Sequence, residues 1–145
     1  MKYWLMKSEP AAFGIDDLAA RPRRTAEWDG VRNFQARNML RDDFRKGDRA
    51  FFYHSGCAVP GIAGVVEVVR EGYPDDTALD PKHADPRWFA VDVRLLRKLE
   101  RVITLQELRS HATGALRDLA ILRRGNRLSI TPLSKKEWDF ILSLA

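Results

Sequence analysis

The sequence has little cysteine and little histidine. Cys57 is the single cysteine among 145 residues, which excludes a disulfide within the chain and a zinc site built from several cysteines. The three histidines are scattered along the chain and show no metal-ligand spacing: His54, His83 and His111. We therefore expect no metal ion, and the low cysteine content is consistent with a reducing compartment.

Long apolar runs are also absent. Near the start of the chain only residues 3–6 form an apolar stretch, which is shorter than the roughly 7 to 15 residue core of a signal peptide. No apolar run reaches the roughly 18 residues that a membrane-spanning helix needs. We expect a cytoplasmic protein without a membrane partner.

The motifs of several enzyme classes are missing. No GxxxxGK[ST] or GxGxxG segment occurs, so no nucleotide cofactor is expected. His54 and Ser55 are neighbours, but adjacent strand residues point to opposite faces and no Gly-x-Ser-x-Gly turn surrounds the serine. Four carboxylates lie close together but lack the EF-hand spacing: Asp75, Asp76, Asp80 and Asp85. The sequence therefore indicates a binding protein with no catalytic residue and no cofactor.

Composition and charge are those of a basic globular protein. The length, with 45% hydrophobic and 31% charged residues, predicts a single domain over residues 1–145. The net charge is +5, and 18 of the 25 basic residues are arginines. Arginine suits forked recognition of phosphate. A GC-rich genome would produce the same arginine content, so the charge alone favours a nucleic-acid partner only weakly.

Hydrophobic spacing predicts alternating strands and helices. Strands are expected at 2–7, 49–54, 62–70, 88–96 and 127–131, and helices at 15–19, over most of 31–45, at 104–108, at 116–122 and after the capping box 134–137. Segment 21–27 is expected to be a polar connector, and 73–87 a long surface loop that is a candidate binding element. Gly64 predicts a bulge or a close backbone approach. This order indicates an α+β fold with a small, curved, mostly antiparallel sheet.

Aromatic and polar residues gather where these elements meet, which is where pockets form. They are Trp28, Asn33, Asn38, Tyr53, Ser55 and Trp88. Each has a structural alternative: Trp28 can anchor a helix start, and Asn33 can cap a helix.

Several segments together resemble the EVE domain family over nearly the whole chain. They are YWLMKSEP (3–10), IDDL (15–18), WDGVRNFQARN (28–38), FYHS (52–55), PGIAGVVEVVRE (60–71), DPRWFAVDVR (85–94) and RLSITPLSKKEWDFI (127–141). The resemblance implies a single PUA-like domain, a curved and mostly antiparallel β-barrel flanked by helices. It also implies kinship with YTH domains, which hold a methylated base in an aromatic cage. Many members have tyrosine where this chain has Phe34, so a hydroxyl is lost there.

The resemblance also implies a pocket for a base, with Trp28 as one wall and Tyr53, Trp88 or Phe89 as the other. The residues predicted to form it are Lys7, Ser8, Trp28, Asn33, Tyr53, Ser55 and Trp88. Arginines on the helix and before the last strand are expected to follow the phosphates: Arg32, Arg37, Arg41, Arg123, Arg124 and Arg127.

The predicted function is non-enzymatic binding of a modified base, methylated in the leading case, that is flipped out of DNA or RNA. Burying one methyl group contributes about 0.8 kcal/mol, so a selectivity of a few-fold is expected. The partners would be the modified nucleic acid and a separate effector protein. Two alternatives use the same surface: a small-ligand protein or enzyme that holds a nucleoside or metabolite in this pocket, and a protein-interaction module.

Overall fold

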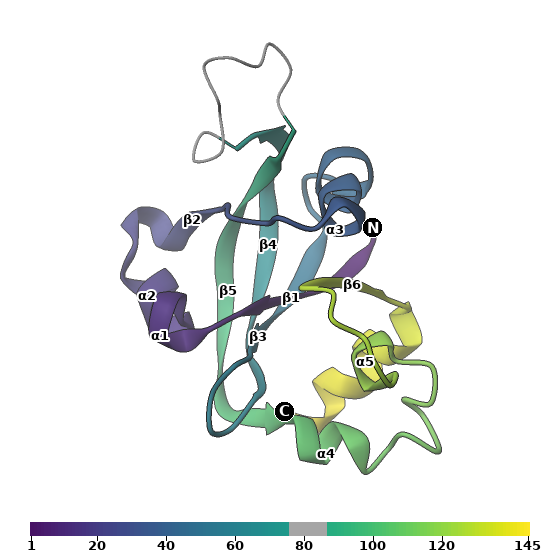
Figure 1. Cartoon of the computed structure of the whole chain (residues 1–145). Coiled ribbons are helices and arrows are strands. Elements are labelled where there is room, and N and C mark those ends of the chain that lie inside the picture. The colour runs from purple at the N-terminus through teal and green to yellow at the C-terminus, as the bar shows by residue number, and fades with distance from the viewer. Residues whose placement is uncertain (76–86) are drawn as a thin grey trace.

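The structure is a computed structural model that describes residues 1–75 and 87–145, and its centre is a curved six-stranded sheet (Figure 1). The strands are β1 (Tyr3–Ser8), β2 (Thr25–Trp28), β3 (Arg49–His54), β4 (Gly61–Pro74), β5 (Phe89–Thr104) and β6 (Ile130–Leu133). They are ordered β2-β5-β4-β3-β1-β6. Only β1 and β3 pair in parallel within these residues. The expected α+β fold with a mostly antiparallel, curved sheet is confirmed, and β2 and β6 are its two unpaired edges among the described residues.

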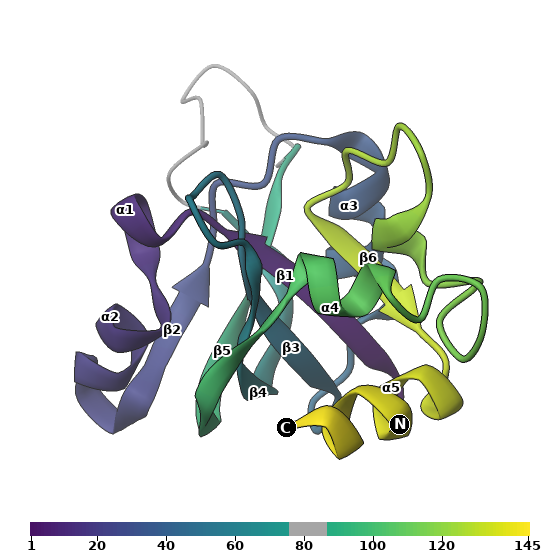
Figure 2. The same cartoon turned by 90° about the horizontal axis from the view of Figure 1, so that it is seen from below.

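Short helices flank this sheet. They are α1 (Pro10–Phe13), α2 (Ile15–Ala20), the 3-10 turn η1 (Pro22–Arg24), α3 (Phe34–Asn38), the π-helical turn η2 (Met39–Asp43), α4 (Leu105–Arg109), the 3-10 turn η4 (Ala120–Leu122) and α5 (Lys135–Leu144). Figures 1 and 2 place α1 and α2 beside β2, and α4 and α5 together on the other side of the sheet. None of the helices in the described part of the chain is both long and apolar enough to span a membrane.

Two hydrophobic cores lie on opposite faces of the sheet. The first, which we call the α2–α3 core, contains Trp28 and Phe52 and is covered by α2 and α3. The second, the α5 core, contains Phe51 and Trp138 and is covered by α4 and α5. β3 supplies both cores because successive strand residues point to opposite faces. Its apolar side chains are therefore buried on both sides, as the continuous apolar pattern of 49–54 predicts.

A local signal explains where α5 begins. Ser134 and Glu137 form the predicted capping box of α5, with reciprocal side-chain to backbone hydrogen bonds.

Gly64 lies at an irregularity in the pairing of β4. A Cβ atom there would lie 2.7 Å from both the Arg97 carbonyl oxygen and Ile15 Cδ1. The predicted close approach at Gly64 is confirmed, and it lets α2 pack directly on the sheet.

One prediction about the first third of the chain is wrong. Segment 21–27 is no mere connector, because residues 25–28 form edge strand β2 against β5. Its alternation of buried Ala26 and Trp28 with exposed Glu27 is too short to stand out in the sequence. The helix expected over most of 31–45 is confirmed as α3 followed by η2, and it begins at Phe34 because the Asn33 side chain accepts a hydrogen bond from Ala36 N.

Other element boundaries also differ from the prediction. The last strand begins at Ile130, because Asn126 Oδ1 accepts from Leu128 N and holds a turn there. The first two residues of the loop expected over 73–87, Tyr73 and Pro74, extend β4. Residues 76–86 of that loop, which include three of the four clustered aspartates, lie outside the described residues.

Candidate functional site

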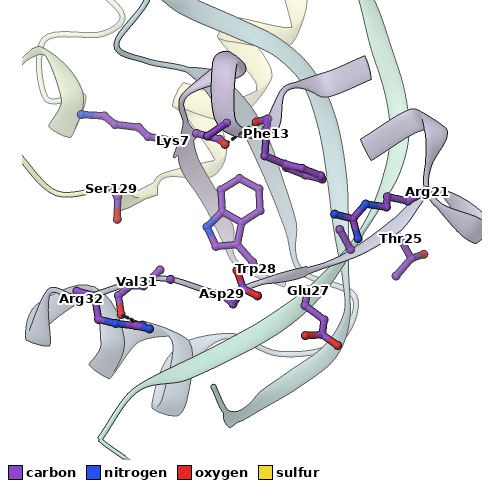
Figure 3. A pocket seen from close by; sticks show the side chains of 14 residues that line it. Lys7, Phe13, Arg21, Thr25, Glu27, Trp28, Asp29, Val31, Arg32 and Ser129 are labelled. Atoms are coloured by element: carbon purple, nitrogen blue, oxygen red, sulfur yellow. Dashed lines mark hydrogen bonds between the residues drawn. The ribbon is translucent and has the colours of Figure 1, made fainter. Parts of the chain in front are cut away.

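A cavity of about 720 Å³ opens on the α2–α3 side of the sheet, within the size range of ligand-binding pockets (Figure 3). The end of β1, α1, β2 with the segment after it, and the residue before β6 form its walls. The lining residues are Lys7, Ser8, Ala12, Phe13, Arg21, Thr25, Ala26, Glu27, Trp28, Asp29, Gly30, Val31, Arg32 and Ser129. The cavity therefore combines segments that are far apart in the sequence.

The Trp28 side chain stands in the middle of these residues (Figure 3). Trp28 is the last residue of β2, and its ring meets Phe52 edge-on, with ring centroids 5.4 Å apart and an interplanar angle of 84°. Only 7% of Trp28 is exposed, so packing restrains the indole. A restrained aromatic wall loses little conformational entropy when a planar ligand stacks on it.

The end of β1 supplies polar groups beside this wall. Burial lowers the pKa of the Lys7 ammonium, while the Lys7 backbone N–H donates to the Ser129 carbonyl at 2.8 Å. Ser8 Oγ donates to the Phe13 carbonyl at 2.6 Å. Because that bond uses the hydroxyl proton, the Ser8 oxygen faces a ligand as an acceptor. Lys7 and Ser8 thus offer one donor group and one acceptor.

The segment that follows Trp28 is held by a buried carboxylate. Asp75, 2% exposed, accepts hydrogen bonds from Gly30 N at 2.9 Å and from Arg32 Nη1 at 3.0 Å. The Asp75 backbone N–H donates to the Trp88 carbonyl. Gly30 has φ +78°, a conformation that glycine adopts without strain. Asp75 therefore fixes the edge of the cavity, although its place in an acidic segment suggested a solvated position.

Arginines approach the cavity from the β2 side. Arg21 lines it, and its guanidinium lies 5.2 Å from the centre of the Phe13 ring. Arg23 and Arg24 have φ of 56° and 52°, and both are exposed. A non-glycine residue in this left-handed region costs about 1 to 3 kcal/mol, and such strain clusters at ligand clamps. Sequence reasoning missed these three residues, although the run RPRR three residues before Trp28 marks them.

A second hollow, of about 460 Å³, lies between the α3–η2 helix and the segment before β6. Gln35 and Met39 line one side, and Arg123 and Arg124 line the other. Asn126 Nδ2 donates to the Ala120 carbonyl at 2.6 Å and so closes the arginine-bearing turn. Since Ser129 belongs to the main cavity, the chain passes from one hollow to the other within a few residues.

Only some of the predicted pocket residues line the cavity in the structure. Lys7, Ser8 and Trp28 lie together around the cavity. Tyr53 is 3% exposed and packs in the α5 core, since it follows Phe52 on β3 and points to the other face of the sheet. Tyr53 is therefore not a second wall of this cavity.

The remaining predicted pocket residues lie near the cavity without lining it. Asn33 uses its side-chain oxygen to cap α3, as its structural alternative predicts. The Ser55 backbone N–H donates to the Ser8 carbonyl, which ties the β3 end to the β1 end. Trp88 stacks on Phe34 with centroids 4.9 Å apart.

The predicted phosphate contacts also separate into groups. Arg32 lines the main cavity, and Arg123 with Arg124 lines the second hollow. Arg127 is exposed on the same turn as that pair. Arg37 donates to the Arg87 carbonyl, and Arg41 forms a bidentate pair with the neighbouring Asp42 carboxylate. The Arg41 and Arg37 bonds are exposed, so exchange for a phosphate contact costs little.

The EVE domain family model matches residues 2–144. The chain belongs to the EVE domain family. Thymocyte nuclear protein 1 of Mus musculus is 47% identical over 166 aligned positions, which cover 98% of this chain and 73% of that protein.

Two solved structures place this EVE domain among known folds. The crystal structure of the human THYN1 protein in complex with DNA that contains 5-methylcytosine superimposes with a TM-score of 0.92 at 45% identity, over 99% of this chain and 97% of that one. The YTH domain of Zygosaccharomyces rouxii MRB1, solved in complex with N6-methyladenosine RNA, superimposes with a TM-score of 0.58 at 14% identity, over 99% of this chain and 85% of that one. The expected PUA-like fold is confirmed.

Proposed function

We propose that this EVE domain binds a modified base in DNA after the base has flipped out of the duplex into the main cavity. The observation that carries the proposal is the restrained Trp28 indole in the middle of a cavity with arginines at its edge. Support comes from the human relative, which is bound to DNA containing 5-methylcytosine. A 5-methylcytosine base is therefore the first ligand to test.

The interaction free energies available in this cavity are comparable with the cost of flipping a base. Stacking on an aromatic side chain contributes about 1 to 3 kcal/mol per base, which offsets an unstacking cost of a few kcal/mol only when polar contacts and phosphates add to it. Lys7 can donate to a ring nitrogen or carbonyl of the base. Ser8 Oγ, or the Asp29 carboxylate at the cavity edge, can accept from an exocyclic amine. This pattern favours amino-bearing bases such as cytosine and adenine.

Binding in this proposal involves no chemical step. Recognition ends with a base stacked on Trp28 and with its phosphates on arginines, so a complex is the end product. A downstream effect would come from an effector protein or from occlusion of the base.

The test measures affinity for matched oligonucleotides that carry cytosine, 5-methylcytosine or N6-methyladenine, in DNA and RNA, at two salt concentrations. We expect a few-fold preference for 5-methylcytosine DNA and an affinity that falls steeply with salt. Trp28→Ala should remove the preference, whereas Trp28→Phe should keep most of it because an aromatic face remains.

Thermal unfolding of each variant separates loss of binding from loss of fold. A folded Trp28→Ala variant that binds all oligonucleotides like the unmutated protein would overturn the proposal. Tight, salt-independent binding of a free nucleoside would overturn it in favour of a small-ligand protein.

A further inference from the structure

Four side chains at the edge of the cavity form one continuous stack. The Arg32 guanidinium lies 5.6 Å from the centre of the Trp88 ring, and Trp88 stacks on Phe34 at 4.9 Å with an interplanar angle of 27°. The Arg37 guanidinium lies 5.1 Å from the centre of the Phe34 ring. We call Arg32, Trp88, Phe34 and Arg37 the rim stack. It starts at the cavity itself, because Arg32 also lines the cavity.

Phe34 is the unusual member of the rim stack, because 55% of this large apolar residue is exposed. Single exposed apolar residues are common on proteins. Val59, which is 58% exposed, is an example. Phe34 differs from such residues because its ring contacts both an aromatic ring and an arginine guanidinium.

Both ends of the rim stack are anchored. Arg32 donates to the buried Asp75, and Arg37 donates to the Arg87 carbonyl at 2.7 Å and to Asn38 Oδ1 at 2.8 Å. Asn33 caps α3 directly before Phe34 and so sets the position of this ring. The two stacked rings therefore present a restrained aromatic surface beside the cavity, with one arginine near each ring.

Such a surface fits one class of ligand, a nucleic-acid strand. Aromatic rings interleaved with arginines are the pattern on which successive bases of a strand stack, with the arginines near the phosphates. When one base leaves the helical stack, its neighbours lose a stacking partner, and an aromatic side chain can replace that partner. We propose that the rim stack is a second nucleotide subsite, in which Phe34 stacks against the base next to the flipped one. The inference rests on the proposed function.

Arg37 has a defined part in this subsite. Its guanidinium lies 5.1 Å from the centre of the Phe34 ring, so a base that stacks on this ring displaces it toward the backbone of the strand. The two hydrogen bonds that Arg37 gives up are exposed, and a phosphate contact replaces them. The Trp88 face of Phe34 stays packed throughout.

A double-mutant cycle tests the contact. Oligonucleotides carry 5-methylcytosine and, beside it, either a natural nucleotide or an abasic site. For the unmutated protein, we expect the abasic neighbour to lower affinity by about five- to a hundred-fold, as the loss of one stacked base does. For Phe34→Leu, which keeps an apolar side chain without a ring, we expect weak binding to the natural oligonucleotide and little further loss with the abasic one. The cycle cancels changes in the free DNA, which are the same for both proteins.

Two control variants make the result specific. Phe34→Tyr keeps the ring and should keep the sensitivity to the abasic neighbour, whereas Val59→Ala should behave like the unmutated protein. If Phe34→Leu lowers the affinity by the same factor for the natural and the abasic oligonucleotide, or lowers it for neither, the second subsite is overturned. The proposed function fails separately, if Trp28→Ala leaves the preference for 5-methylcytosine intact.

Discussion

Each face of the sheet carries a contact between a phenylalanine of β3 and a tryptophan, but the two contacts have different roles. On β3, Phe51 stacks on Trp138 with centroids 3.9 Å apart and an interplanar angle of 19°. The next residue, Phe52, meets Trp28 edge-on at 5.4 Å. The first pair closes a core under α5, whereas the second pair leaves one side of an indole in a cavity of about 720 Å³.

The difference follows from the elements that carry the two tryptophans. Trp138 lies in α5, a ten-residue helix with a complete capping box, which covers its face of the sheet. Trp28 ends β2, a four-residue edge strand, and is followed by an irregular segment that a buried carboxylate, a glycine turn and the buried Val31 hold in place. An indole on a long, capped helix completes a core, while one at the end of a short edge strand is available to a ligand.

Trp138→Ala should have the largest effect on stability. Removing a buried indole that stacks on Phe51 should lower the free energy of unfolding by about 3 to 5 kcal/mol. Trp28→Ala should cost less, because part of the space around Trp28 is already a cavity. Urea denaturation of both variants measures the difference, and equal costs would contradict the contrast between the two faces.

Asp48→Ala should come next. This carboxylate is 3% exposed and accepts from three donors: Lys2 N at 3.0 Å, Trp4 Nε1 at 3.2 Å and Arg45 N at 3.0 Å. Alanine leaves buried donors without partners, so we expect a loss of about 1 to 3 kcal/mol in the free energy of unfolding. Asp75→Asn is the comparison from the cavity side, and it should reduce oligonucleotide affinity more than thermal stability. The prediction is wrong if Asp48→Ala weakens DNA binding without lowering the denaturation midpoint.

The main strands and the C-terminal helix could be predicted from the sequence because their signals are strong and local. The apolar runs of β1 and β3, the close approach at Gly64 and the capping box of α5 each depend on a few adjacent residues, and all are confirmed. β2 was missed because four residues with one alternation give too weak a pattern. Its pairing with β5 is a tertiary contact that no local pattern reveals.

The candidate site was harder to predict because it depends on side-chain direction. Trp28, Lys7 and Ser8 were selected by motif and do lie together. Tyr53 was selected in the same way and lies on the other face, because only the register of β3 decides which residue points where. Asp75 binds the turn at Gly30, and Arg21 lines the cavity beside the strained turn at Arg23 and Arg24; neither turn follows from composition.

Neutralising the strained turn should have a smaller, uniform effect on binding. Arg23→Gln with Arg24→Gln keeps the backbone requirement similar and removes two exposed charges from the turn that joins Arg21, a cavity residue, to β2. If each arginine contacts one phosphate, the slope of log affinity against log salt falls by about 1 per residue, for modified and unmodified DNA alike. Arg117→Gln, an exposed arginine outside the two hollows, is the matched control and should leave the slope unchanged. A change in the preference for 5-methylcytosine would instead assign these residues to the base pocket.

The smallest expected effect is the pH dependence contributed by His54, which links β3 to the start of α2. His54 Nε2 accepts a hydrogen bond from Ile15 N at 3.1 Å, which requires the neutral ring. Burial lowers the pKa of His54 from its usual 6.5, with the Asp16 carboxylate opposing this change and the Lys98 ammonium adding to it. The unfolded chain therefore takes up the proton first as the pH falls. The stabilisation is complete above about pH 6.5 and is lost toward the lower folded pKa.

Urea denaturation at about pH 7.5 and about pH 5.5 measures this loss. His54→Gln keeps an acceptor oxygen without a titrating group, so its free energy of unfolding should change less between the two pH values than that of the unmutated protein. Carboxylates elsewhere contribute equally to both proteins, and only the difference between them reports on His54. Identical pH dependence in the two proteins would show that the bond to Ile15 contributes nothing to the anchoring of α2 on the sheet.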